Sequence, residues 1–90
     1  MPYIMQSDRQ ILDPDIAELV RHITCSGELN YVITRIVAGV TRVGMKYERI
    51  NAAIGVLECV KLELYRRLVV PYEQTKIQEN CDVPEYRKTD

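Results

Sequence analysis

The sequence has very little histidine and no stretch suited to a membrane. His22 is the only histidine, so a Ser/His/Asp hydrolase site is improbable and a histidine-based zinc centre would lack ligands. Every apolar run is interrupted well before the ~20 residues that cross a bilayer. The first residues show no basic segment followed by an apolar one, so no secretory signal is expected. There is also no Gly-rich phosphate loop. We therefore expect no membrane, no metal and no cofactor.

The sequence also has no excess of positive or negative charge. Lys and Arg together number 12 and Asp and Glu 13, which leaves a net charge of −1. A chain so balanced has no general attraction for nucleic acid or an anionic membrane. The 47% apolar and 28% charged residues are ordinary values for one globular domain, here residues 1–90. The three widely spaced cysteines are odd in number, which favours reduced thiols and a cytoplasmic protein.

Apolar residues at helical spacing predict an all-α fold. Asp13-Pro14-Asp15 has the residues of a helix start, with Asp as N-cap and Pro at the first helical position. Residues 1–12 would then be an extended arm. The first helix is expected to end near Thr24 to Gly27, and a second to run over 28–40. The short loop between them predicts an N-terminal αα-hairpin.

A long third helix is predicted after a turn over residues 41–46. Its apolar pattern runs over residues 47–70. The next residue, Pro71, has no backbone N–H to donate and should kink or restart the helix. Residues 72–80 can form a short last helix. The polar residues 81–90 are expected to form an extended or loose tail.

The third helix is more apolar than one side of a small domain requires. Its apolar residues spread over an arc well beyond the ~100° that usually faces a core. A chain of 90 residues has few helices to cover such an arc, so we expect a homodimer or higher homo-oligomer. The candidate interface residues are Ile50, Ile54, Leu57, Leu64 and Leu68.

A polar cluster lies within this arc, made up of Asn51, Glu58, Lys61 and Tyr65. Glu58 and Lys61 are three residues apart and can form an ion pair. In one interpretation the pair is partly buried and fixes how helices align, with Asn51 and Tyr65 adding hydrogen bonds. In the other, Glu58 is a functional carboxylate with a raised pKa in a cleft.

Three segments carry a family resemblance: Met1-Pro2-Tyr3-Ile4, the string GELNYVIT over residues 27–34, and INxxxGVLECxKxExYRRxxxPYE over residues 50–73. With these, the chain resembles a family of short proteins of bacteria and their phages that is defined as a domain of unknown function. The resemblance covers most of the chain and implies no activity and no catalytic residue. The family's C-terminal motif is Asn-Gly-Asp-Val-Tyr. This chain instead reads Asn80-Cys81-Asp82-Val83-Pro84, so a tight glycine turn is not carried over to this end.

An enzyme alternative is a metal-dependent, nucleotide-binding helical protein like the all-α pyrophosphatases. Magnesium would need carboxylates that converge on one point, and Glu28, Glu58 and Glu63 are the candidates. Glu58 and Glu63 differ by about 140° around a helix and cannot both face one ion. His22 and Cys25 are too few for a zinc site.

A second alternative is a helix-turn-helix DNA-binding protein. Its recognition helix would present Asn30, Tyr31, Thr34 and Arg35. The basic residues near the second turn are Arg35, Arg42, Lys46 and Arg49. The acidic Glu28 at the helix start and the net charge disfavour nucleic acid. The sequence thus favours a small accessory protein without catalysis, whose partner is a second copy of the chain or another protein.

Overall fold

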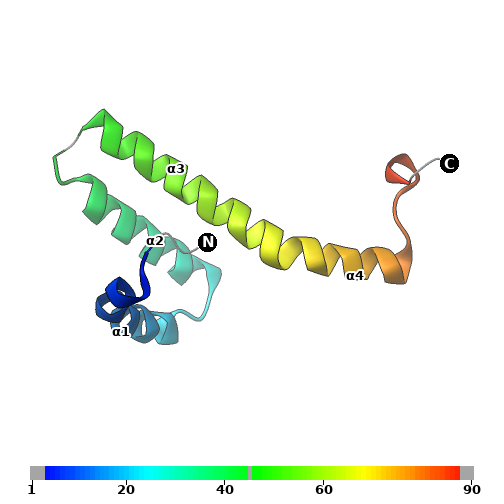
Figure 1. Cartoon of the computed structure of the whole chain (residues 1–90), viewed down its shortest axis with the longest axis horizontal. Helices are drawn as coiled ribbons and strands as arrows, with labels where there is room; N and C mark the ends of the chain where they lie inside the picture. The colour runs from blue at the N-terminus through cyan, green and yellow to red at the C-terminus, as the bar shows by residue number, and fades with distance from the viewer. Residues whose placement is uncertain (1–3, 45, 88–90) are drawn as a thin grey trace. The chain divides into compact units, whose positions relative to one another are not determined.

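A computed structural model gives the structure of residues 4–44 and 46–87. Within these residues the chain is helical, with no strand, which confirms the predicted all-α fold. The chain divides into two compact units, Met1–Ala53 and Ile54–Asp90. Figure 1 shows the helices in chain order from blue to red.

The first unit begins with α1, which spans Gln6–His22. The predicted start at Asp13 is wrong, and so is the extent of the arm over residues 1–12, because Gln6 to Leu12 are already helical. Pro14 lies inside the helix and leaves the carbonyl of Gln10 without an intrahelical donor. Gln10 is exposed, so water can satisfy that carbonyl and the helix continues through the proline.

The second helix of this unit is α2, Ser26–Thr41, as the apolar period predicted. Residues 23–25 connect it to α1, which gives the expected helical hairpin. Gly27 is not the end of α1 but the second residue of α2. After α2 the chain turns at residues 42–44, where Gly44 has a φ of 87° that a residue without Cβ adopts at no steric cost.

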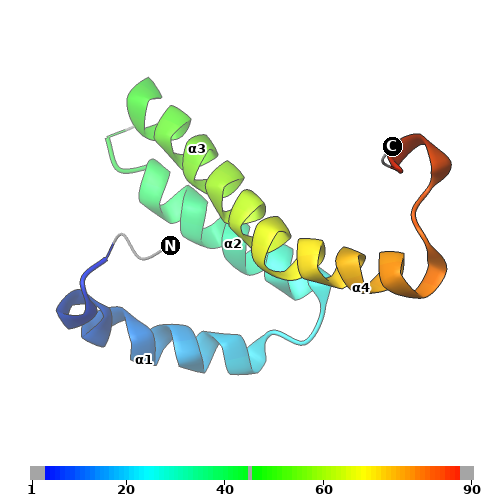
Figure 2. The ribbon, with the colours of Figure 1, turned by 45° about the vertical axis from the view of Figure 1, so that its right-hand side comes forward.

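The long helix begins as α3, Tyr47–Leu64, and continues through a π-helical turn, η1, Tyr65–Val69, into α4, Val70–Asn80. In Figures 1 and 2 the ribbon of the second unit passes from α3 to α4 without a break. The backbone N–H of Val70 donates to the carbonyl of Tyr65, five residues back. This wider turn comes directly before Pro71, which cannot donate to the carbonyl four residues earlier. The kink predicted at Pro71 is therefore confirmed as a π-helical turn.

Helix α4 ends in a tight turn at Cys81. This residue has φ 65° and ψ 158°, a conformation that is almost confined to glycine. Its backbone N–H donates to the carbonyl of Ile77 over 2.8 Å. The tail then forms a 3-10 turn, η2, Pro84–Tyr86, and the carboxylate of Asp82 accepts the N–H of Val83 over 2.8 Å. The end of the chain up to Arg87 is thus more ordered than the sequence predicted.

No side chain in the described part of the chain is buried. Every α-helix carries exposed large apolar side chains, and Ile16, Ile36 and Ile54 each expose more than half of their surface. None of the helices of residues 4–44 and 46–87 combines the length and apolar character of a membrane span. Helix α3 has exposed apolar side chains along its length, so it is the first candidate for a functional site.

Candidate functional site

The predicted interface residues all lie on α3 or its π-helical continuation, and all are open to solvent. Two are about 40% exposed, Ile50 at 40% and Leu57 at 39%, while the others exceed half. Those more exposed residues are Ile54, Leu64 and Leu68. An apolar surface of this extent on one helix is typical of an interaction site. Whether it is an interface between copies stays a prediction.

The polar cluster contains the ion pair that the sequence predicted. Nζ of Lys61 lies 3.1 Å from Oε1 of Glu58, one helical turn apart. Within the single chain this pair is exposed, at 55% for Glu58 and 69% for Lys61. An exposed ion pair contributes little to stability. The partial burial that one interpretation expected for this pair is therefore not found among the described residues.

Tyr65 in the same cluster makes a contact that the sequence analysis missed. Its hydroxyl donates to Oε1 of Glu73 over 3.1 Å, across eight residues. Residues eight apart diverge by about 80° on a regular α-helix, but the extra residue of a π-turn brings them nearly into line. The hydrogen bond to the negative Glu73 raises the pKa of the Tyr65 phenol. Knowledge of the π-turn would have been needed to find this contact. The remaining residue of the polar cluster, Asn51, is exposed on α3.

Glu63 of α3, which the sequence analysis considered as a magnesium ligand, is part-buried and faces two arginines. Its carboxylate lies 2.7 Å from Arg66 and 2.6 Å from Arg67. Arg66 and Arg67 follow Glu63 by three and four residues, the two sequence spacings at which side chains meet on one face of a helix. This carboxylate is therefore already neutralised by cations of its own helix and does not present an open position for a metal ion.

Glu28, the third carboxylate of the enzyme alternative, has a structural contact at the start of α2. Its Oε1 accepts hydrogen bonds from the backbone N–H and the hydroxyl of Thr24, over 2.7 and 2.8 Å. These bonds favour the charged form, so they lower the pKa of Glu28. No group of three His, Cys, Asp or Glu side chains that could hold a metal ion occurs in residues 4–44 and 46–87.

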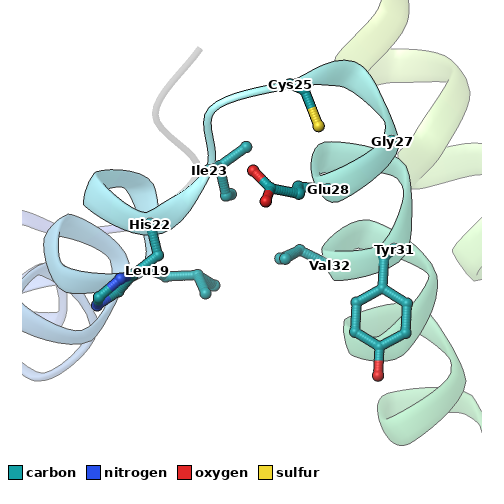
Figure 3. Close-up of a pocket in the computed structure, with 8 residues that line it drawn as sticks. All are labelled: Leu19, His22, Ile23, Cys25, Gly27, Glu28, Tyr31 and Val32. Carbon is teal, nitrogen blue, oxygen red and sulfur yellow. The ribbon is translucent and has the colours of Figure 1, made fainter.

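A hollow of about 440 Å³ lies between the end of α1 and the start of α2. In Figure 3, Leu19 and Ile23 approach it from one side and Val32 from the other. The side chain of His22 instead turns to Glu18, with Nε2 3.2 Å from Oε1. Cys25 also borders the hollow, but the walls are mainly apolar. His22 and Cys25 are thus not brought together as metal ligands.

The polar face of α2 is occupied by contacts along the helix. The hydroxyl of Thr34 donates to the side-chain oxygen of Asn30 over 3.2 Å. Arg35 donates to the hydroxyl of Tyr31 over 2.9 Å, with its guanidinium 5.7 Å from the ring centre. Asn30, Tyr31, Thr34 and Arg35 are the side chains that a recognition helix would need to present to bases. Arg49, from the basic residues near the second turn, donates to the backbone carbonyl of Val43.

Taken together, the helices and this surface define a small all-α protein with an exposed apolar arc and no assembled reaction centre among its described residues. The chain belongs to the family described as "Domain of unknown function (DUF6899)", which matches residues 1–83. No curated protein and no solved structure matches the chain.

Proposed function

We propose that the protein is a small cytoplasmic interaction or accessory protein that works as a homodimer or higher homo-oligomer. Assembly occurs through the apolar arc of α3, and the role is not catalytic. The observation that carries the proposal is that no described side chain is buried although 47% of the residues are apolar. A chain in this state has not yet gained the free energy that apolar burial supplies to folding.

The size of the uncovered surface supports an obligate assembly. In α3 and its π-helical continuation, Ile54, Val60, Leu64 and Leu68 each expose more than half of their surface. A standard protein interface takes about 800 Å² from each partner, and obligate homodimers bury about 1,000–2,500 Å² from each. Covering the apolar arc therefore requires an extensive, mainly apolar contact, of the kind found between subunits that do not fold apart.

The engagement of the acidic residues supports an accessory role over metal-dependent nucleotide chemistry. Glu58 pairs with Lys61, and Glu28 accepts two bonds from Thr24. A magnesium site would need free carboxylate oxygens directed at one point. The cytoplasmic placement is supported by the three cysteines, which are free and exposed and so fit a reducing compartment.

The test is a charge placed in the arc. In Leu57→Asp an unpaired carboxylate would be desolvated in the interface, so we expect the assembly to dissociate or the helices to unfold. Ala52→Asp is the matched control, because this exposed residue lies about 140° from Leu57 around the same helix. Size-exclusion chromatography with circular dichroism should show loss of the oligomer only in Leu57→Asp. Equal behaviour of the two variants would contradict the proposal.

A further inference from the structure

The arrangement of charges on α3 specifies how two copies would meet, if the proposed self-association holds. From Ile54 to Tyr65, only Glu58 and Lys61 bring charge into the apolar arc. Both are exposed, and their charged atoms lie 3.1 Å apart. Any partner that covers the arc desolvates this pair, and opposite charges from the partner at the same places would offset the cost of desolvation.

A second copy can supply those charges in one orientation. In an antiparallel pair with two-fold symmetry, residues at equal distances on either side of the axis lie opposite each other. Glu58 and Lys61 are equally distant from the midpoint between Cys59 and Val60. With the axis at this point, each Glu58 faces Lys61 of the second copy, and the four charges alternate in sign.

The same axis also brings apolar side chains of the two copies opposite each other. Leu57 comes opposite Leu62 of the second copy, and Ile54 comes opposite Tyr65. All four are exposed in the single chain, at 39%, 56%, 61% and 50% in the order named. Around the helix they lie within about 70° of one direction, which Glu58 and Lys61 share. The apolar residues therefore flank the charge cluster on both sides and can shield it from water.

The parallel orientation has the opposite effect. Two parallel copies in register bring Glu58 beside Glu58 and Lys61 beside Lys61, and like charges across an interface cost several kcal/mol. We infer that the partner of the α3 arc is a second copy of the chain, bound antiparallel, with two intermolecular pairs between Glu58 and Lys61 at its centre. The Glu58 and Lys61 side chains are then the determinants of orientation and register.

Charge reversal tests this inference in the full-length protein. In an antiparallel dimer, Glu58→Lys gathers four positive charges and Lys61→Glu four negative ones, so each single change should raise the dimer dissociation constant about tenfold or more. The double change Glu58→Lys, Lys61→Glu restores alternating charges and should return the constant to within about threefold of the unmodified protein. Sedimentation equilibrium measures these constants, and circular dichroism confirms that each variant is helical.

The controls are the same reversals in α4, Lys76→Glu and Glu79→Lys. These residues form an exposed pair of the same spacing, 3.2 Å apart, well away from the proposed axis. Their reversal should leave the dimer unchanged. If the unmodified protein dimerises and Leu57→Asp dissociates it, but the reversals at Glu58 and Lys61 behave like these controls, the antiparallel arrangement is wrong and the proposed function stands. The arrangement is also refuted if the double change does not rescue. A monomeric unmodified protein overturns both proposals.

Discussion

The turn at Cys81 offers a quantitative test of backbone strain. Cys81 has φ 65° and ψ 158°, and a residue with a Cβ in this region costs roughly 1–3 kcal/mol. Cys81→Gly removes this cost but adds about 0.5–1 kcal/mol of backbone entropy lost on folding. The net expectation is a gain of about 1 kcal/mol, which corresponds to roughly 4–8 °C in melting temperature for a chain of this size.

Thermal and urea unfolding, followed by circular dichroism at one fixed protein concentration, measures this gain. Cys81→Ala is the matched control, since it removes the thiol and keeps the Cβ. It should leave stability within about 0.5 kcal/mol of the unmodified protein. Equal stabilities for the glycine and alanine variants would refute the strain, as would a loss in Cys81→Gly. The turn would then owe its shape to the hydrogen bond between Cys81 and Ile77 alone.

Three other perturbations follow from single contacts. Because the pKa of Glu28 is lowered, the charged carboxylate contributes to the stability of the fold above its ordinary pKa of 4.5. This contribution is lost as the pH falls through the lower folded-state pKa. Helix content should therefore decline less on acidification in Glu28→Gln, which circular dichroism from pH 6 to 2 can show. Pro71→Ala restores a backbone donor and should convert the π-turn into regular α-helix; two-dimensional NMR should show the contact between Tyr65 and Glu73 lost, and its persistence would contradict this cause. A gel shift with random duplex DNA should show no binding at physiological salt, whereas salt-sensitive binding abolished by Arg35→Ala with Arg42→Ala would support the helix-turn-helix alternative.

Much of the fold could be predicted because the apolar residues recur at helical spacing. The period in residues 28–40 placed α2, and Pro71 marked the bend before α4. The start of α1 was misplaced, since Pro14 has the sequence context of a first helical residue but lies in the helix interior. The free-energy cost of one proline inside a helix is small here, because water can reach the carbonyl that it leaves unpaired. The many other residues that favour helix offset this cost.

The candidate site was predictable only where contacts are local. The pair of Glu58 and Lys61 follows from a spacing of three residues, and the structure has it. The bond from Tyr65 to Glu73 depends on an extra residue in the helical turn, and Cys81 has a positive φ that its residue type does not favour. Neither is encoded in side-chain periodicity. The role of the α3 arc depends on a second molecule and stays a prediction.

The mass of the native protein in solution tests the central claim most directly. Light scattering at about 10 µM should give a particle of about 21 kDa or a higher multiple of the 10.4 kDa chain, with the helices formed. Such a result is what self-association through the arc of α3 predicts. A stable, helical particle of 10.4 kDa over the whole micromolar range would contradict the account, because a lone chain would then tolerate the exposed apolar surface that we assign to self-association.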